Sequence, residues 1–397
     1  MRPQDPTTAD PLSSDFWDSA SPQLLRPPGT SSTDRPHPRD LGTLCPPGSL
    51  VFPTSGSTGS PKAVVITRDA ILASAELVVR WLGIRPDDQC LLALPSYHVG
   101  GIGVIARARM AQCALHHLPG KWCPIRVSST CRDLRISITS LVPTQIHDIV
   151  QAGMRAPPTL RTVVVGGGAL SPALAQTATS LGWPVLASFG MTETSSQIAT
   201  EKMTLSAPGE SSPPMLPLIS GWHARSTPDY RLAVRGPALA KGILTREQTR
   251  PGQWTFQALP LSDGWWTTTD LAHVRTDDNG QTWIQPLGRA DDQIKIRGEL
   301  VSLAAMQWLA EKAAADVNIN PALVAVTDTP DPRAGSLLAL ILEPKASPRT
   351  SDLRRRFNEL APPFARIAAT HTATIPSLPR SPLGKIRRAA LRSFPFT

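Results

Sequence analysis

The stretch Thr54-Ser55-Gly56-Ser57-Thr58-Gly59-Ser60-Pro61-Lys62 follows directly on the apolar run Leu50-Val51-Phe52. Its two glycines let a backbone approach a ligand closely, its N–H groups and hydroxyls can donate hydrogen bonds, and Lys62 adds positive charge. This combination suits a polyphosphate, although the stretch does not have the Walker spacing G-x-x-x-x-G-K-[ST]. A flexible Ser/Gly surface turn is the alternative, and the stretch alone does not decide between the two.

Length and charge narrow the class of protein. The chain has 397 residues, of which 41 % are hydrophobic, and its net charge is +9 at pH 7. This length suits one large and one small domain. The positive charge could serve solubility, nucleic acid, an anionic membrane or an anionic substrate. Basic residues are scattered without interleaved aromatics, so we expect no nucleic acid partner. Most of them are arginines, which makes a lysine inside a motif informative.

The cysteines and the apolar runs indicate the compartment. The five cysteines are odd in number and contain no C-x-x-C pair, which argues against a disulfide framework and a zinc site; they are Cys45, Cys90, Cys113, Cys123 and Cys131. No N-terminal segment reads as a signal peptide, and no apolar run is long enough to cross a bilayer. We therefore expect a cytoplasmic protein without membrane insertion.

Composition divides the chain into three parts. Residues 1–47 are rich in Pro, Ser, Thr and Asp, which predicts a loosely ordered arm with one short helix around Phe16-Trp17. Residues 48–288 alternate strand-like and helix-like blocks, which predicts an α/β domain with mostly parallel sheets flanked by helices, plus a β-rich section. Residues 289–397 read as a small α+β domain.

Hydrophobic periodicity places the expected elements. Strands are expected at 50–53, 89–94, 136–141, 162–165, 184–188, 231–235, 283–286, 293–297, 322–327 and 337–342, and helices at 68–81, 99–111, 143–152, 172–181, 302–315 and 350–360.

A second motif, Phe189-Gly190-Met191-Thr192-Glu193-Thr194-Ser195-Ser196-Gln197, follows an apolar strand. Ligands bind beyond the carboxyl ends of strands in open parallel sheets. Phe189 offers a ring face to a purine, Thr192 a hydroxyl to a phosphate, and Glu193 an oxygen ligand to Mg²⁺. Taken alone, this motif is better explained as a helix start, with Thr192 as the cap and Glu193 in the first turn.

Four further motifs follow the same logic. Gly166-Gly167-Gly168 comes after a buried strand and lets backbone approach a flat ligand, or forms a tight turn before Pro172. Asp270, at a strand end, can accept from both hydroxyls of a ribose, or is an ordinary loop residue. The run 287–301 lies where the character of the chain changes, and Lys385 lies in a Pro/Gly-rich loop or a solvated tail.

From about residue 50 to the C-terminus, the order and the amino-acid sequences of these motifs resemble those of the adenylate-forming superfamily, which includes the acyl-CoA synthetases. The segments Leu94-Pro95-Ser96-Tyr97-His98-Val99-Gly100-Gly101 and 190–197 are most similar to the o-succinylbenzoate–CoA ligases of menaquinone biosynthesis. The resemblance implies an ATP- and Mg²⁺-dependent ligase that forms an acyl-adenylate, releases pyrophosphate and then forms the coenzyme A thioester.

The resemblance also implies roles for individual residues. The phosphates would be held by Thr54, Ser55, Gly56, Ser57, Thr58, Gly59 and Lys62. Adenine would be framed by Gly166, Gly167, Gly168 and Phe189, and the ribose would be bound by Asp270 and Arg289. Thr192 would contact the α-phosphate, Glu193 the metal, and Lys385 the α-phosphate and attacking carboxylate, while Lys295 belongs to the cofactor-binding motif around the hinge. His98, Ser195 and Ser196 would border the acyl pocket, and Asp291 would be the hinge of a C-terminal lid.

Some positions depart from the family pattern. Ala63, Thr269 and His273 stand where glycines are usual, and Leu383 replaces a serine. Much of the N-terminal subdomain of longer relatives has no counterpart, so a homodimer partner could cover one wall. The alternatives are a ligase or stand-alone adenylation enzyme for another carboxylic acid and, more remotely, a non-catalytic nucleotide-binding protein.

Overall fold

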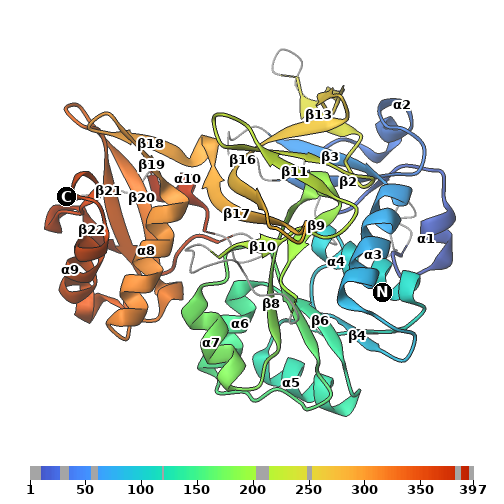
Figure 1. The fold of residues 1–397 in the computed structure, drawn as a ribbon, viewed down its shortest axis with the longest axis horizontal. Helices are drawn as coiled ribbons and strands as arrows, with labels where there is room; N and C mark the ends of the chain where they lie inside the picture. Colours follow the sequence, from blue (N-terminus) through green and yellow to red (C-terminus); the bar gives the residue numbers. More distant parts are fainter. Residues whose placement is uncertain are drawn as a thin grey trace.

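The computed structural model describes residues 10–26, 35–54, 61–118, 120–202, 214–247, 253–380 and 386–392. It has a large lobe, built from residues up to about 289, and a smaller lobe that carries the C-terminus (Figure 1). No helix in these ranges is long and apolar enough to cross a membrane.

One sheet of the large lobe is mainly parallel. Its strands are β4 (Gln89–Leu92), β5 (Ala114–His117), β6 (Ile138–Leu141), β7 (Thr162–Val165), β8 (Val185–Met191) and β9 (Ser196–Thr200). They lie in the order β5-β4-β6-β7-β8-β9, and only the pair β8–β9 is antiparallel. The connecting helices are α4 (Val99–Ala111), α5 (Pro124–Asp133), α6 (Pro143–Gln151) and α7 (Pro172–Ser180). The strand β7 is buried along its whole length, as expected for a central parallel strand covered on both faces.

A second sheet is built around a β-hairpin. It contains β1 (Gln23–Leu24), β2 (Ser49–Thr54), β3 (Lys62–Thr67), β13 (Gly242–Arg246) and β14 (Trp254–Ala258), in that order. The strands β2 and β3 are antiparallel, with Thr54 opposite Lys62. The helix α3 (Arg68–Leu82) follows; the Thr67 hydroxyl caps its first turn, and Gly83 ends it in the left-handed conformation.

The third sheet of the large lobe is antiparallel. It contains β10 (Leu216–Pro217), β11 (His223–Ser226), β12 (Arg231–Arg235), β15 (Leu261–Ser262), β16 (Trp265–Thr276) and β17 (Thr282–Arg289). The 3₁₀ turn η2 (Thr192–Thr194) joins β8 to β9, and η3 (Ala290–Asp292) leads from β17 into the small lobe.

The small lobe is α+β. It contains β18 (Gln293–Ile296), β19 (Glu299–Ser302), β20 (Val324–Asp331), β21 (Gly335–Leu342), β22 (Thr372–Thr374), α8 (Leu303–Asp316), α9 (Thr350–Leu360) and α10 (Arg388–Arg392). Short 3₁₀ turns complete both lobes: η1 (Pro38–Asp40), η4 (Pro321–Leu323), η5 (Ser347–Arg349), η6 (Pro363–Ala365) and η7 (Ala369–His371).

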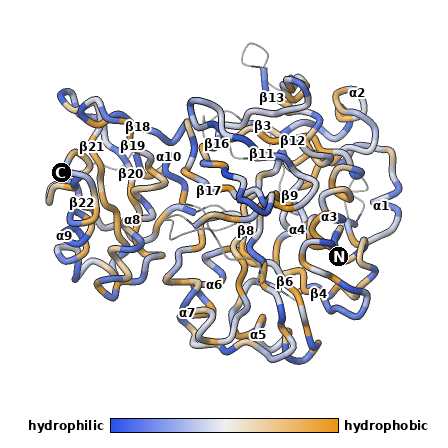
Figure 2. Tube along the Cα trace, viewed as in Figure 1, coloured by the Kyte–Doolittle hydropathy of each residue, from blue (hydrophilic) through white to orange (hydrophobic). Residues whose placement is uncertain are grey.

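The two lobes have separate hydrophobic cores. Leu303, Val326 and Leu340 belong to a cluster made only of small-lobe residues, whereas Val163 and Ile198 belong to the main cluster of the large lobe. Figure 2 shows hydrophobic colour along β20 and β21 and along the parallel strands, and hydrophilic colour at the turn between β18 and β19. Each lobe therefore buries its own apolar surface, which allows the two to move relative to one another.

The N-terminal stretch contains the short helix expected around Phe16-Trp17, and its described part packs against the large lobe. In its described part, α1 (Ser14–Asp18) buries Phe16 and Trp17, and α2 (Leu41–Leu44) buries Leu41. The buried guanidinium of Arg68 donates to the Phe16 carbonyl and stacks over its ring, with 5.0 Å between the guanidinium carbon and the ring centre. The sequence indicated the helix at Phe16-Trp17 but not the burial of its two aromatic side chains.

The expected fold class and the strand at 50–53 are confirmed, but the mostly parallel character of the sheets is wrong and the strand after the glycine-rich stretch was missed. A mainly parallel sheet is found once in the large lobe, because the other two sheets are mainly antiparallel. The strand expected at 50–53 leads into a hairpin, since the apolar run Ala63-Val64-Val65-Ile66 forms a second buried strand beside it. The strand β9 and the helix α5 were also not expected.

Phe16 provides a test of the docked N-terminal stretch. We expect Phe16→Ala to lower the free energy of unfolding of the large lobe by about 3–5 kcal/mol, because a fully buried ring leaves a cavity. Leu12→Ala, at a half-exposed position, is the control and should change it by less than about 0.5 kcal/mol. Urea unfolding followed by tryptophan fluorescence measures both; equal effects would show that α1 is not part of the core.

Candidate functional site

Loops after four parallel strands meet at one edge of the sheet. The strands β4, β6, β7 and β8 run in the same direction, so their carboxyl ends lie together. A Cβ placed on Gly166 would lie 2.8 Å from the Ser188 hydroxyl, and one placed on Gly167 would lie 3.4 Å from Val142. The glycine run therefore lies between strand β8 and the start of the loop after β6; Gly166 packs closely against Ser188, whereas Gly167 and Gly168 are exposed.

The turn that carries Thr192 and Glu193 is tightly constrained. The Thr194 hydroxyl lies 3.0 Å from the Met191 carbonyl and 2.8 Å from the Ser196 carbonyl, and it is buried. Gly190 packs so closely that a Cβ there would lie 2.1 Å from the Ser196 carbonyl oxygen. This packing leaves the side chains of Thr192 and Glu193 partly exposed at the edge of the sheet.

Two backbone hydrogen bonds join this turn to β3. The N–H of Ala240 donates to the Glu193 carbonyl at 2.8 Å, and the next N–H, that of Lys241, donates to the Val65 carbonyl at 2.8 Å. The turn η2 also contacts β3 directly. Glu193 thus lies beside the strand that begins at Lys62. The predicted phosphate-binding residues Ser55, Gly56, Ser57, Thr58 and Gly59 lie outside the described residues, as does Lys385.

The two residues expected to bind a ribose face each other across a strand pair. Asp270 on β16 is the register partner of Arg289 on β17. The Arg289 guanidinium donates two hydrogen bonds to Asp291, at 2.8 and 2.9 Å. These bonds, with the charge of Asp270, hold the pKa of Arg289 above its ordinary value. The predicted hinge residue is thus a direct partner of a predicted ligand-binding residue, which the sequence did not indicate.

His98 precedes α4 and presents an unpartnered nitrogen. Its ring lies 4.7 Å from that of Tyr97 between centres, and its buried Nε2 has no hydrogen-bond partner within the described structure. Burial lowers the pKa of the imidazole, because the charged form loses hydration. A neutral ring with one free polar atom suits a hydrogen bond to a bound substrate.

The structure separates the two serines expected at the acyl pocket. A Cβ on Gly103 of α4 would lie 3.2 Å from the Ser196 hydroxyl, so this side chain faces α4. Ser195 is fully buried, and its hydroxyl donates to the Ala238 carbonyl at 2.7 Å. The hydroxyl of Ser195 is thus used within the fold, and the place of this residue at the acyl pocket stays a prediction.

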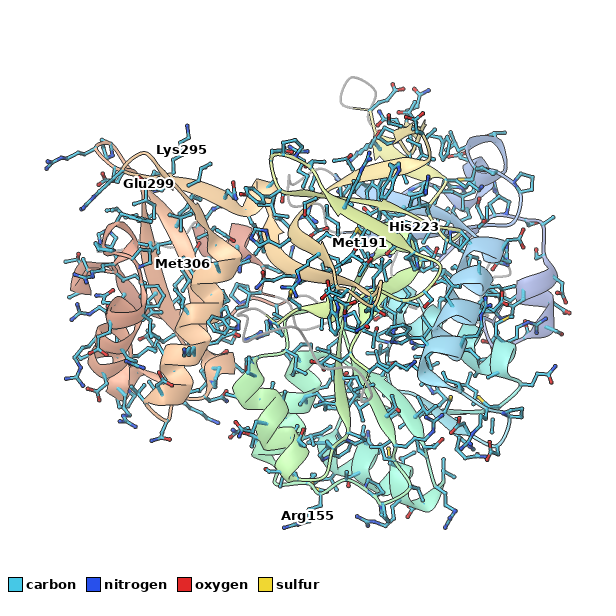
Figure 3. The ribbon with its side chains drawn as sticks, viewed as in Figure 1. Arg155, Met191, His223, Lys295, Glu299 and Met306 are labelled. Carbon is cyan, nitrogen blue, oxygen red and sulfur yellow. The ribbon has the colours of Figure 1, made fainter. Side chains whose placement is uncertain are left out.

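Lys295 is not brought to the other candidate residues. It is exposed on β18, and Figure 3 shows it at the upper edge of the small lobe, pointing away from Met191 at the centre of the molecule. In this arrangement of the lobes, Lys295 lies outside the candidate site.

Arg107 is a buried charge that sequence reasoning missed. It lies on α4, one turn after Gly103, and is 6 % exposed. Its guanidinium donates to the side-chain oxygens of Gln197 at 2.8 Å and Ser140 at 2.9 Å, both neutral. Burial lowers its pKa to about 10, so it stays charged at neutral pH. An arginine among Ile105, Ala106 and Ala108 was the signal in the sequence.

A cleft of about 630 Å³ separates the lobes beside these loops. The large lobe lines it with Leu94, Pro95 and His147, and the small lobe with Asn320, Glu343 and Arg380. Arg380 forms a β-bridge with Ile386, the residue after Lys385. The base of the predicted lysine loop therefore faces the segment that leads to His98.

The chain matches the AMP-binding enzyme family over residues 16–244. The chain belongs to this family. Among curated relatives, the 2-succinylbenzoate–CoA ligase of Bacillus cytotoxicus is 31 % identical over 256 residues, which are 62 % of this chain and 50 % of the relative. The enzyme of the same name from Bacillus pumilus is 27 % identical over 88 % of this chain and 69 % of its own length. The chain thus spans about half to two thirds of these relatives.

Solved structures agree on the fold. The o-succinylbenzoate CoA synthetase of Bacillus subtilis, in complex with the acyl-adenylate intermediate, has a TM-score of 0.70 and 24 % identity, covering 87 % of this chain and 69 % of that one. ATP-bound MatB from Rhodopseudomonas palustris has a TM-score of 0.67 and 21 % identity, covering 86 % and 67 %. An α/β domain with a smaller C-terminal domain is the shared architecture.

Gly190 tests the packing of the turn. We expect Gly190→Ala to destabilise the large lobe by about 1–3 kcal/mol, since its Cβ would overlap the Ser196 carbonyl. Gly168→Ala is the matched control, because its Cβ would meet only Pro143 at 3.5 Å, an ordinary contact. Urea unfolding compares the two, and an unperturbed Gly190→Ala protein would contradict this packing.

His98 predicts a pH dependence of stability. Its pKa is lower in the folded than in the unfolded protein, so the unfolded state binds more protons once the pH falls below about 6.5. The free energy of unfolding should therefore fall with pH below that value. Part of this dependence should disappear in His98→Asn, as measured by urea unfolding between pH 7.5 and 5. An unchanged pH dependence would contradict the buried neutral ring.

Proposed function

We propose that this chain is an AMP-forming acid–thiol ligase that joins a carboxylic acid to coenzyme A at the expense of ATP. Membership of the AMP-binding enzyme family and the names of its relatives support the reaction class. The main structural support for this proposal is the contact between the turn with Glu193 and the strand that begins at Lys62. This link supports a site in which Glu193 and Lys62, the first residue of β3, act together.

The acid that the chain supports best is o-succinylbenzoate, in menaquinone biosynthesis. Curated relatives carry this substrate in their names. The substrate has two carboxylates, one that reacts and one that does not. Arg107, a buried guanidinium held by two neutral partners, supplies a positive charge that is not cancelled by either of them. Arginine suits recognition of a distal carboxylate.

In the first half-reaction, a carboxylate oxygen attacks the α-phosphorus of ATP, and the bond to pyrophosphate breaks. Both reactants are anions, so the barrier depends on positioning and on neutralising charge. Lys62 and Lys385 supply positive charge, Thr192 a hydroxyl, and Asp270 and Arg289 hold the ribose. The partly exposed carboxylate of Glu193 fits Mg²⁺, which binds through one or two carboxylates together with substrate phosphates. The ion would neutralise phosphate charge.

In the second half-reaction, the sulfur of coenzyme A attacks the acyl carbon and AMP leaves. We propose that the small lobe, residues 289–397, turns about Asp291 between the halves. The separate cores of the two lobes permit this rotation. In its course Lys385 would withdraw and the face around Gly298 would approach the site. The Arg289–Asp291 ion pair lies at this pivot and would have to be remade as the lobe moves.

A ligase or adenylation enzyme for another acid is the second candidate. The fold of MatB is shared at a TM-score of 0.67, so architecture does not select the acid. Pyrophosphate exchange across a panel of acids, with coenzyme A or a carrier protein as acceptor, separates these activities.

The two half-reactions test the proposal. With ATP, Mg²⁺, coenzyme A and o-succinylbenzoate, we expect AMP and thioester to form in equal amounts. Lys385→Ala should slow adenylate formation by at least about 10²-fold while sparing thioester formation from a supplied acyl-adenylate. Lys345→Ala, at a small-lobe position outside the predicted site, is the control. Single-turnover measurements decide: equal loss in both halves would contradict the role of Lys385, and AMP release without o-succinylbenzoate dependence would contradict the substrate.

A further inference from the structure

Two cysteine side chains approach each other at the base of the β4–α4 unit. Sγ of Cys90, on β4, lies 3.5 Å from Sγ of Cys113, which follows the C-terminal end of α4. Neither thiol has a role in the proposed reaction. A disulfide bond is about 2.05 Å long, so a modest movement of the two side chains brings the sulfurs to bonding distance.

The backbone holds both positions in place. Cys90 lies on a strand that pairs with β5 on one side and β6 on the other. The N–H of Cys113 donates to the Ala108 carbonyl at 3.1 Å, and Gln112 closes the helix in the left-handed conformation, at φ 53°. The proximity of the sulfurs thus follows from the strand pairing and the helix cap.

The two thiols differ in access and in acidity. Cys90 is 3 % exposed, whereas Cys113 is only partly buried. The hydrogen bond between them lowers the pKa of Cys113, and the same contact, with burial, raises that of Cys90. Arg107 favours the Cys90 thiolate and Arg161 that of Cys113, while Asp88 opposes both. Accessible thiols of low pKa beside a second cysteine are typical of redox-responsive pairs.

The remaining cysteines lack this arrangement. Cys45 and Cys131 are buried in other clusters, and burial raises their pKa values to about 11 and about 12. Cys123 precedes α5, where the backbone N–H of Arg126 lowers its pKa. It is therefore an acidic thiol at a different place and a suitable control.

We propose that Cys90 and Cys113 form a reversible disulfide when the protein meets a peroxide. The Cys113 thiolate attacks one peroxide oxygen, the O–O bond breaks, and a sulfenic acid and hydroxide form. The Cys90 sulfur then attacks the Cys113 sulfur and displaces the second hydroxide as the S–S bond forms. Two thiols together lose two electrons, and with their two protons the peroxide is reduced to two waters.

The disulfide would close a covalent ring around the segment that carries His98. Closing a loop restricts the unfolded chain, so oxidation should raise the melting temperature of the large lobe. A thiol reductant restores the starting state. This inference is independent of the proposed reaction, because it concerns only the two sulfurs and the stability of the fold.

Peptide mapping of the full chain tests the proposal. Trypsin cuts after Arg107 and Arg109, so it separates the peptide 81–107, with Cys90 as its one cysteine, from 110–121, with Cys113. After treatment with hydrogen peroxide and alkylation of free thiols, we expect these peptides joined with a loss of two hydrogens, and released by dithiothreitol. The oxidised protein should also melt at a higher temperature than the reduced one.

Matched variants complete the test. Cys123→Ser should leave the joined peptides and the temperature shift unchanged, whereas Cys113→Ser should abolish both. In Cys90→Ala, Cys113 loses its resolving thiol and should proceed to the sulfinic acid, with a gain of two oxygens. Oxidation of Cys113 in the unsubstituted protein without joined peptides, or joining of Cys113 to Cys123 instead, would overturn the proposal.

Discussion

The candidate site depends on two successive backbone hydrogen bonds, from Ala240 to Glu193 and from Lys241 to Val65, each 2.8 Å long. Ala240 and Lys241 lie just before β13, which pairs with β3, so one short segment touches both the hairpin and the turn after β8. Without this link, the second sheet and the parallel sheet would present their loops separately. With it, residues more than a hundred positions apart share one edge of the large lobe.

Much of the fold could be predicted because the signals were local. The helix around Ile71 repeats apolar residues at helical spacing, the helix around Ile105 is a long Gly-rich apolar run, and β7 is a short apolar run, so their positions were evident from the sequence. The hairpin of β2 and β3 was not evident. A strand that ends in a glycine-rich loop has the same sequence pattern whether a helix or a second strand follows the loop. Residues 62–67 form a strand because β3 pairs with β13, and the paired residues 242–245 are distant in the sequence.

Candidate site residues could be proposed where the residue type itself indicates the chemistry. They could not be proposed where tertiary packing determines whether a side chain is buried or reaches the site. Glu193 and Asp270 were proposed from their motifs; Glu193 lies in the turn between β8 and β9, whereas Asp270, expected at a strand end, lies in the middle of β16. Ser195 shares its motif with Ser196, yet its left-handed backbone turns its hydroxyl into the fold. Arg107 belongs to no motif. Its candidate role was recognised only from its burial and its hydrogen bonds to Gln197 and Ser140. Lys295 shows the converse, a motif residue that the present arrangement of the lobes leaves exposed.

Hydrogen–deuterium exchange with an acyl-sulfamoyl analogue of the adenylate tests the central claim most directly, namely that distant segments surround one nucleotide. We expect amides in 61–67, 189–200 and 266–292 to gain protection together at the same ligand concentration. Protection of one of these segments while the others stay unchanged would contradict it.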